Sequence, residues 1–346
     1  MLRKYATHIM RLCRLETSII ILQLIDYQMF INKILSLKQI FPFPKMYFPF
    51  GSRGANILLP LSILLFFNQP KAEAQQAVKK KLPTHQEVFR EKMKLPKPET
   101  MAEGVVEFGK TFIGNPYPKS NINPLPNANG IVKLQPISQE VLVVNLRLFD
   151  CVTFAESIIA LTQTRRSNTP NFEIFKQNIA KLRYRNAEID YAARLHYFSD
   201  WFFENEKRGI LKNITKEIGG EILNKTIFYM SHKKDTLYGN MADSNTYNRM
   251  VTVENDITNR EKFYIPKERV AGIESNIKNG DIIGITNRLD GMDMAHVGIA
   301  IWQNGRLYMM HASSQFRQVL ITDVPLADYL ARNKGQTGIM VGRLMD

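Results

Sequence analysis

The sequence predicts an α+β fold, in which a helix that carries a cysteine packs on an antiparallel sheet. The first observation is the helical pattern of residues 150–161, which holds Cys151 and places Phe154, Ile158 and Leu161 on one buried face. The second is a series of short apolar runs near the C-terminus that read as strands: residues 281–285, 294–302 and 306–312. A hairpin turn between the last two predicts antiparallel pairing.

The composition is that of an ordinary globular protein, with 346 residues, 45% of them hydrophobic and 23% charged. Two cysteines are too few for a disulfide framework. The formal net charge of +14 suits any anionic polymer, so by itself it selects neither a cell-wall polymer nor a nucleic acid. Because no block of basic residues is interleaved with aromatic residues, we expect no nucleic-acid partner.

Residues 1–45 carry apolar clusters that are each shorter than the roughly 18 uninterrupted apolar residues of a membrane-spanning helix. We interpret this segment as an over-extended start or an N-terminal extension. Residues 46–74 combine a basic start, the apolar core of residues 57–67 and an Ala-x-Ala site that ends at Ala74, which is typical of a secretory signal peptide. The alternative is an N-terminal membrane anchor that stays uncleaved. Cleavage would leave a secreted, periplasmic protein with no stable membrane association.

The next segment, residues 75–100, is rich in Lys, Gln and Pro and predicts a linker or a loosely docked arm. The folded domain is expected over residues 101–346. It opens with a helix over residues 101–112, where apolar residues recur at helical spacing, and a turn at residues 114–118 ends that helix. Residues 140–148 then predict a short strand that leads into the helix of the cysteine.

Between that helix and the sheet, the pattern predicts two more helices and a polar surface loop. The helices cover residues 172–182 and 191–203, and the loop covers residues 243–260. His196 falls in the second of these helices beside aromatic residues, so we interpret it as a structural histidine.

Three residues carry the candidate chemistry. Cys151 lies in the first turn of its predicted helix, near the positive end of the helix dipole, which favours a thiolate of lowered pKa. The alternative is a small buried side chain with no chemical role. The Asn304-Gly305 turn joins two strands that bring His296 and His311 to nearby levels. This is the geometry of a cysteine hydrolase, with Cys151 as nucleophile, His296 as acid and base, and His311 as the residue that orients His296.

Four motifs lie at these positions: Asp-Cys-Val-Thr-Phe-Ala-Glu from Asp150, Gly-Asp-Ile from Gly280, Ala-His-Val-Gly-Ile from Ala295 and His-Ala-Ser-Ser from His311. Together they resemble the NlpC-like, papain-fold cell-wall cysteine peptidases. Three further motifs narrow the branch: Gly-Asn-Pro-Tyr from Gly114, Arg-Leu-His-Tyr-Phe from Arg194 with Trp201, and Met-Ser-His from Met230. The whole set resembles the N-acetylmuramoyl-L-alanine amidase-like branch.

The resemblance implies a papain-like cysteine hydrolase core that uses no metal and no other cofactor. The histidine spacings agree with this, because they match no zinc motif and no His-Glu-x-x-His is present. The resemblance also implies that Tyr117 lies beside the nucleophile and that Asp150 binds a polar substrate group. Alternatively, Tyr117 packs a turn and Asp150 caps the helix of Cys151. His232 is a further candidate for the lining of the substrate cleft.

On this basis we expect a cysteine amidase that cleaves the muramoyl-L-alanine amide bond of peptidoglycan or of its turnover fragments, with residues 101–346 as the catalytic domain. Two alternatives share the same core: a γ-D-glutamyl-diamino acid endopeptidase on cell-wall stem peptides, and a cysteine acyltransferase. The Gly114 and Arg194 motifs favour the amidase, and an acyltransferase would be expected to have a broad apolar patch. A third alternative, a catalytically inactive cell-wall binding module, is disfavoured because the cysteine and both histidines are present.

Overall fold

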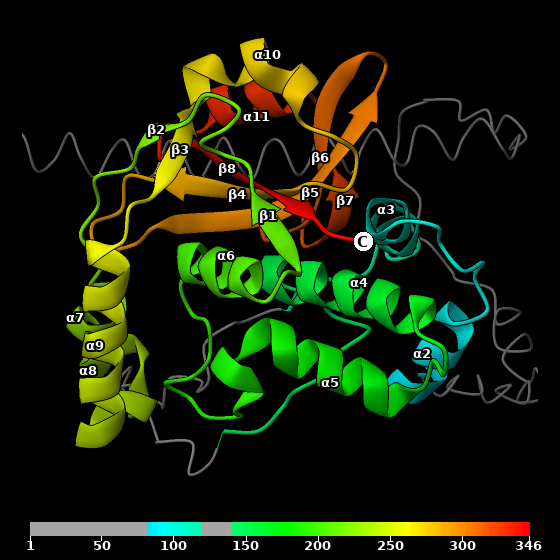
Figure 1. The fold of residues 1–346 in the computed structure, drawn as a ribbon, viewed down its shortest axis with the longest axis horizontal. Helices are drawn as coiled ribbons and strands as arrows, with labels where there is room; N and C mark the ends of the chain where they lie inside the picture. The colour runs from blue at the N-terminus through cyan, green and yellow to red at the C-terminus, as the bar shows by residue number, and fades with distance from the viewer. Residues whose placement is uncertain (1–81, 119–139) are drawn as a thin grey trace, which may run out of the picture. The chain divides into compact units, whose positions relative to one another are not determined.

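The computed structural model describes residues 82–118 and 140–346 (Figure 1). Its α-helices are α2 (His85–Lys92), α3 (Met101–Lys110), α4 (Cys151–Arg166), α5 (Phe172–Arg183), α6 (Phe198–Lys207), α7 (Tyr229–His232), α8 (Lys234–Leu237), α9 (Ser244–Asn259), α10 (Val270–Ile273) and α11 (Leu326–Arg332). Its strands are β1 (Leu211–Asn213), β2 (Glu221–Ile222), β3 (Phe263–Pro266), β4 (Ile282–Asn287), β5 (Met294–Gln303), β6 (Arg306–Ser313), β7 (Gln318–Ile321) and β8 (Gln336–Leu344). Over these residues, no helix is long and apolar enough to cross a membrane. The predicted N-terminal extension and signal peptide lie outside the described residues.

The strands form one antiparallel sheet in the order β2-β3-β8-β4-β5-β6-β7, and β1 also pairs with β8. Successive residues of a central strand enter different cores. Ile282 packs in the core that includes α3, α4, α5 and α6, whereas Ile283 packs in the core that includes α10 and α11. Figure 1 shows α4 and α6 on one side of the sheet and α10 and α11 on the other. The predicted α+β class with an antiparallel sheet is confirmed.

The hairpin between β5 and β6 forms where the sequence predicted it. Asn304 has a φ of 50° and Gly305 a φ of 74°, and positive values at both positions are those of a type I′ turn. The two strands pair from this turn back to Ile299 and Met310, where their ladder ends. Beyond that pair β6 continues to pair with β7. The segments that carry the candidate histidines therefore lie outside the β5–β6 ladder.

Helix α4 begins at Cys151 because Asp150 caps it. The Asp150 carboxylate accepts a hydrogen bond from the backbone N–H of Thr153 at 2.7 Å, and the Thr153 hydroxyl accepts one from the Asp150 N–H at 3.1 Å. The predicted core residues Phe154 and Ile158 are fully buried. Contacts with α3, α5 and β5 surround the helix and hold its first turn against the sheet. The predicted helices over residues 101–112 and 172–182 are also present, as α3 and α5.

Within residues 75–100, which were predicted to be a linker or a loosely docked arm, the described part contains helix α2. Thr84 caps α2, and the ring of Phe89 is 4% exposed. Phe89 packs against Phe172 and Phe175 with ring centroids 5.4 Å away in each case. A single buried aromatic residue thus docks a segment whose average composition is polar.

The strand predicted over residues 140–148 is wrong, because no residue of that segment pairs in the sheet and residues 146–148 form a bend. Val141 and Val143 are each 58% exposed. Side chains replace the ladder hydrogen bonds: Arg183 Nη1 donates to the Val143 carbonyl oxygen at 2.6 Å, and His85 Nδ1 accepts from the Leu146 N–H at 3.2 Å. These bonds fix the chain just before Cys151.

Two further predictions need correction. The helix predicted over residues 191–203 begins only at Phe198, so His196 precedes it, in a turn that includes the Tyr184–Arg194 bridge. The loop predicted over residues 243–260 is helix α9, capped by Asp243. Its buried residues are Met250, Glu254 and Ile257. So narrow an apolar stripe is easily missed in a polar sequence.

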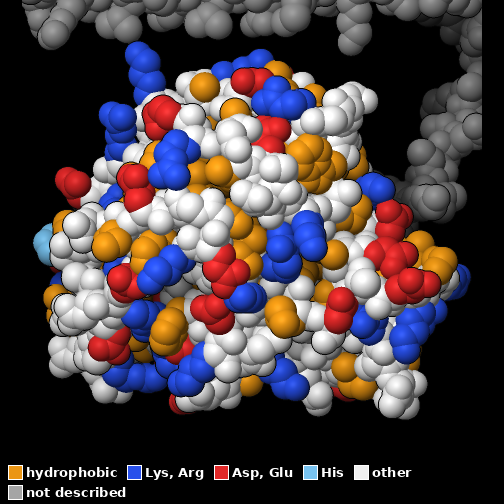
Figure 2. Space-filling model, turned by 45° about the horizontal axis from the view of Figure 1, so that its top comes forward, with side chains coloured by type: hydrophobic (Ala, Val, Ile, Leu, Met, Phe, Trp, Pro, Cys, Tyr) orange, Lys and Arg blue, Asp and Glu red, His pale blue; other side chains and the backbone are white. Residues whose placement is uncertain are grey.

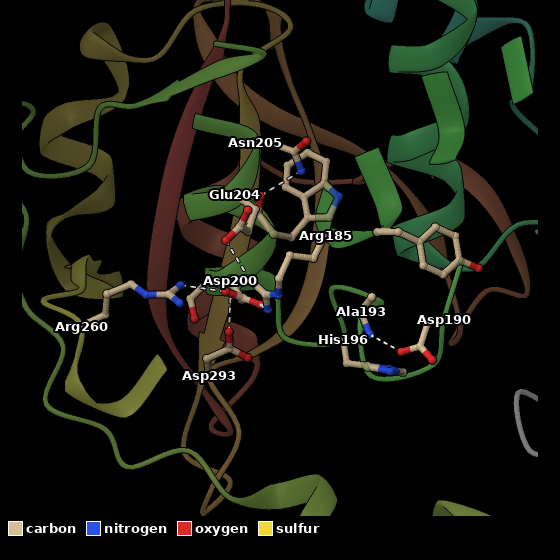
Figure 3. A network of polar contacts seen from close by, with 12 residues as sticks. Arg185, Asp190, Ala193, His196, Asp200, Glu204, Asn205, Arg260 and Asp293 are labelled. Carbon is tan, nitrogen blue, oxygen red and sulfur yellow. Dashed lines mark hydrogen bonds and ion pairs between the residues drawn. The ribbon is translucent and has the colours of Figure 1, made fainter. Parts of the chain in front are cut away.

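A buried network of charges ties α6 to the strand that carries His296 (Figure 3). Asp200, 1% exposed, accepts from Arg185 at 2.6 Å and from Arg260 at 2.7 Å. Arg185 also donates to the buried Glu204 at 2.7 Å, so these two cations pair with two buried carboxylates. The neighbouring Ser199 N–H donates to Asp293 at 2.6 Å. Because Asp293 directly precedes β5, this contact helps to fix the start of that strand.

The positive net charge is not gathered into one patch on the face shown in Figure 2. Lys and Arg side chains are interspersed there with Asp and Glu, and hydrophobic side chains lie between them. Electrostatics on this face therefore favour no single class of polyanion.

Candidate active site

The structure places Cys151 at the first position of α4, half-buried against β5. The backbone N–H groups of Val297, Val152 and Cys151 donate toward its sulfur. The first of these is available because the β5–β6 ladder stops before Val297. The other two are helix-start amides with no partner inside the helix. Val297 follows His296 in the chain, so this contact brings the thiol and the candidate base into one site.

The thiol is neutral in the resting site. Burial, and then the charge of Asp150, raise the pKa of Cys151 to about 12, and the three N–H groups offset this only in part. The lowered thiol pKa predicted from the helix dipole is therefore wrong for the free site. That prediction missed the cost of desolvation and the effect of placing the capping carboxylate beside the sulfur.

The two histidines meet as predicted. His296 Nε2 and His311 Nδ1 are 2.6 Å apart, and the two rings lie nearly perpendicular, at 86°. Burial lowers the pKa of His296 to about 4. Burial and the neighbouring His296 lower the pKa of His311 to about 2. Both rings are therefore neutral at physiological pH and share one proton in their common hydrogen bond.

That shared proton has two possible positions. His296 can act as a base through Nδ1 only if its own proton lies on Nε2 and is donated to His311 Nδ1. His311 must then carry its proton on Nε2. This nitrogen is buried, and among the described residues it has no hydrogen-bond partner.

A cavity of about 560 Å³ opens beside the histidine pair. The residues that line it come from the ends of β4, β5, β6 and β8 and from α11 with its following turn: Asn287, Arg288, Leu289, Ala295, His296, His311, Ser313, Ser314, Gln315, Tyr329, Asn333, Gly335 and Gln336. The Tyr329 ring is 5.7 Å from that of His311, and burial raises the pKa of Tyr329. Both histidines line this cavity, whereas Cys151 is not among the lining residues and contacts the backbone next to His296.

Sequence reasoning missed Asn287, Tyr329 and Gln336 in this cavity. Asn287 ends β4, Gln336 begins β8 and Tyr329 lies in α11. Only the β4–β8 register, which pairs Asn287 with Gln336, brings them together. No local motif in the sequence marks that pairing.

Of the predicted substrate contacts, Asp150 caps α4 and Tyr117 lies in a turn attached to the segment before Cys151. The Asp150 side chain is engaged as the cap of α4, and Thr153 supplies both an N–H and a hydroxyl to it, at 2.7 and 2.8 Å. Tyr117 is half-buried, and its N–H donates to the Arg317 carbonyl at 2.8 Å. The neighbouring Pro116 accepts from the Phe149 N–H at 3.1 Å, which attaches this turn to the segment before Cys151.

The two remaining histidines lie apart from this site. His232 ends α7, is exposed, and packs its ring 4.5 Å from that of Phe228. It does not line the cavity. His196 Nε2 lies 2.8 Å from the Tyr191 carbonyl oxygen, and burial and Arg194 lower its pKa to about 3. Within residues 82–118 and 140–346, no group of three or more His, Cys, Asp or Glu side chains could hold a metal ion.

Comparison with known proteins assigns these features to a family. The sequence matches a family model described as AmiA-like, N-acetylmuramoyl-L-alanine amidase-like, over residues 107–339. The structure is similar to an N-acetylmuramoyl-L-alanine amidase from Bacteroides uniformis, with a TM-score of 0.64 and 29% identity over 71% of this chain and 99% of that one. A DUF1460 protein from Legionella pneumophila has the same fold, with a TM-score of 0.52 and 24% identity over 75% of this chain and 93% of that one. No curated protein matches the chain.

Proposed function

The chain belongs to the N-acetylmuramoyl-L-alanine amidase-like family, and from this membership we propose that it is a cysteine-dependent amidase that cleaves the muramoyl-L-alanine amide bond. The family itself implies a hydrolase that acts on peptidoglycan. One observation carries the cysteine mechanism. His296 is in contact with His311 at 2.6 Å, and the next residue in the chain, Val297, donates its N–H to the Cys151 sulfur.

The proposed reaction starts from a neutral thiol and a neutral imidazole. Cys151 transfers its proton to His296 Nδ1 as its sulfur attacks the amide carbonyl carbon, so thiolate and imidazolium form together and stabilise each other. The C–N bond breaks, and His296 gives the proton to the departing amine of the alanine. Water then attacks the lactyl thioester, His296 accepts its proton, and the free carboxylate and the thiol are released.

The start of α4 supplies the electrostatic stabilisation in this proposal. The N–H groups of Cys151 and Val152 donate toward the sulfur. The carbonyl carbon that the sulfur attacks must come close to them, so in this proposal they stabilise the negative charge that develops on its oxygen. The proposed substrate contacts next to the nucleophile are Asp150, which directly precedes Cys151, and Tyr117, in the turn that Pro116 attaches to the segment before Cys151. His232 is proposed only for the outer part of the cleft, because it is exposed and does not line the cavity.

A digest of defined muropeptides tests this proposal. Mass spectrometry should find a free lactyl carboxylate on muramic acid and a free α-amine on the alanine. Cys151→Ser should abolish the reaction while keeping the fold, and EDTA should leave the parent rate unchanged. A cut between D-glutamate and the diamino acid would favour the endopeptidase instead, and acyl transfer to an added amine or alcohol would favour the transferase. EDTA inhibition reversed by zinc would overturn the cysteine mechanism.

We further propose a secreted, periplasmic location, supported by the signal-peptide pattern of residues 46–74. The exported chain should then begin at Gln75. N-terminal sequencing of protein exported from its native host checks this, and a start before Ile57 would contradict it.

A further inference from the structure

Three buried polar atoms without partners lie on one wall of the cavity. Asn287 is 7% exposed, His311 1% and Gln336 6%. Within the described part of the chain, Asn287 Nδ2, His311 Nε2 and Gln336 Oε1 have no hydrogen-bond partner. Buried polar groups in native proteins are nearly always paired, so three such atoms in one cavity indicate a ligand that pairs with them.

Other contacts fix which end of each amide remains free. Asn287 Oδ1 accepts from the Leu289 N–H at 2.7 Å, so the amide nitrogen of Asn287 is the unpartnered end. Burial raises the pKa of Tyr329, and a hydrogen bond from the Gln336 side chain offsets part of that rise, so Gln336 donates its amide nitrogen to the phenol and leaves its oxygen free. Asn287 and Gln336 are directly opposed in the β4–β8 pairing, so their side chains lie on the same face of the sheet. The wall therefore presents one donor and one acceptor as neighbours.

The charges around this wall indicate a neutral ligand group. Among the lining residues, Arg288 is the only one with a permanent charge, and it is exposed. No carboxylate or ammonium lines the described cavity. An anion would leave the Gln336 oxygen opposed by negative charge, and a cation would meet the Asn287 amide hydrogens. A group with its own acceptor and donor satisfies both.

We propose that Asn287 and Gln336 bind an amide group of the substrate, whose carbonyl accepts from Asn287 and whose N–H donates to Gln336. This subsite rests on the proposed function for the identity of the substrate, a muropeptide, which offers amides in the sugar acetamido group and in the stem peptide. The cavity of about 560 Å³ is large enough to hold either.

The same subsite sets the state of the base. When His311 Nε2 donates to a second acceptor on the ligand, its proton is held on Nε2. His311 Nδ1 then accepts from His296 Nε2, and His296 Nδ1 is left free to accept the thiol proton. Substrate binding thus selects the tautomer that the reaction needs.

The chain supplies a matched pair of variants. Asn287→Asp keeps the oxygen that accepts from Leu289 but loses the amide donor. Asn171→Asp makes the same change at an exposed residue outside the cavity, whose Oδ1 accepts from the Ile174 N–H at 3.0 Å. Both are made in the Cys151→Ala protein, and binding is measured by calorimetry with three probes: N-acetylmuramoyl-L-alanyl-D-isoglutamine, its N-deacetylated form, and N-acetylmuramoyl-L-alanine with the shortened stem.

Asn287→Asp should weaken binding of the first probe about 10- to 100-fold, because a buried acceptor then faces the ligand carbonyl, and Asn171→Asp should change it less than about twofold. If the acetamido group is bound, the loss disappears with the N-deacetylated probe. If a stem amide is bound, the loss of affinity in Asn287→Asp persists with the N-deacetylated probe and disappears with N-acetylmuramoyl-L-alanine. Gln336→Met, which removes the acceptor, should give the same pattern and serves as the second variant if Asn287→Asp does not fold.

Equal losses in the Asn287 and Asn171 variants, or one loss shared by all three probes, would overturn the subsite. The proposed function fails separately. Absence of muramoyl-alanine cleavage by the parent protein, with an Asn287-specific binding loss, would retain the subsite and reject the reaction. Cleavage by the parent protein without a binding loss specific to the Asn287 variant would retain the reaction and reject the subsite.

Discussion

His296 Nε2 and His311 Nδ1 lie 2.6 Å apart, although the β5–β6 ladder ends before it reaches either residue. At this level the two strands are joined by the hydrogen bond between the His296 and His311 side chains and not by backbone hydrogen bonds of the β5–β6 ladder. The loss of pairing also frees the Val297 N–H for the Cys151 sulfur. One interruption of the ladder therefore both orients the base and places the thiol next to it.

The first prediction concerns alkylation of Cys151. Because burial raises its pKa to about 12, loss of the proton to bulk water is rare at neutral pH, and a thiolate there needs His296 as acceptor. His296→Gln should make the iodoacetamide rate at Cys151 rise about tenfold per pH unit from pH 6 to 10, since the thiolate fraction does so below its pKa. The parent should react faster at pH 7 and with a flatter profile.

The measurement is mass spectrometry of the Cys151 peptide over that pH range, which separates this thiol from Cys13. The Ser157→Ala variant, which changes a buried residue of the same helix α4, is the control and should keep the parent profile. Identical slopes in the parent and in His296→Gln would show that His296 does not take the thiol proton.

Local signals in the sequence predicted α4 and the β5–β6 hairpin, because a cap, an apolar face and an Asn-Gly turn are read from neighbouring residues. The three candidate catalytic residues follow from those two elements. Asn287 and Gln336 could not be predicted, since only the pairing of β4 with β8 brings them together. Helix α2 was missed for a related reason: its one buried ring, Phe89, meets partners on α5 that are distant in sequence.

The second prediction concerns the buried pair of Glu156 and Arg183, which are 2.8 Å apart with side chains 2% and 10% exposed. Arg183→Met should lower the free energy of unfolding by about 3–5 kcal/mol, because it leaves a buried carboxylate unpaired and removes the donor to Val143. Burial already raises the pKa of Glu156, so the carboxyl takes up a proton more readily at low pH and the deficit should shrink there.

Urea unfolding at pH 7.5 and pH 5 measures both effects. Glu91→Gln breaks the pair with Lys94, whose side chains are 66% and 71% exposed, and should change the stability little. A loss in Arg183→Met no larger than in this surface control would contradict the prediction.

The third prediction concerns His196. Burial and Arg194 lower its pKa from 6.5 to about 3, so the folded protein binds this proton more weakly than the unfolded chain does. Its contribution to stability is complete above pH 6.5 and is lost as the pH falls from 6.5 toward 3. His196→Gln should therefore lose less stability than the parent between pH 7.5 and pH 5.

Urea unfolding midpoints at the two pH values give this comparison directly. The other buried histidines are present in both proteins, so their contributions cancel in the difference. A parallel loss in parent and variant would mean that His196 is protonated as easily in the folded protein as in the unfolded chain.

The last prediction separates the two site histidines. His296 carries both proton transfers in the proposed reaction, and general acid–base catalysis contributes about 10²–10⁴ in rate. His311 transfers no proton to or from the substrate in this reaction; it holds the Nε2 side of His296, and a Gln or Asn amide can also accept that hydrogen bond. His311→Gln or His311→Asn should retain measurable turnover, whereas the same changes at His296 should reduce kcat/KM to near background.

The measurement is kcat/KM for all four variants on one muropeptide, with Cys151 alkylation against pH as a second readout. The ring that exchanges the thiol proton must be the one whose loss alters thiol reactivity. A larger fall in kcat/KM in His311→Gln than in His296→Gln, together with an unchanged alkylation profile in His296→Gln, would therefore reverse the roles of base and orienting residue.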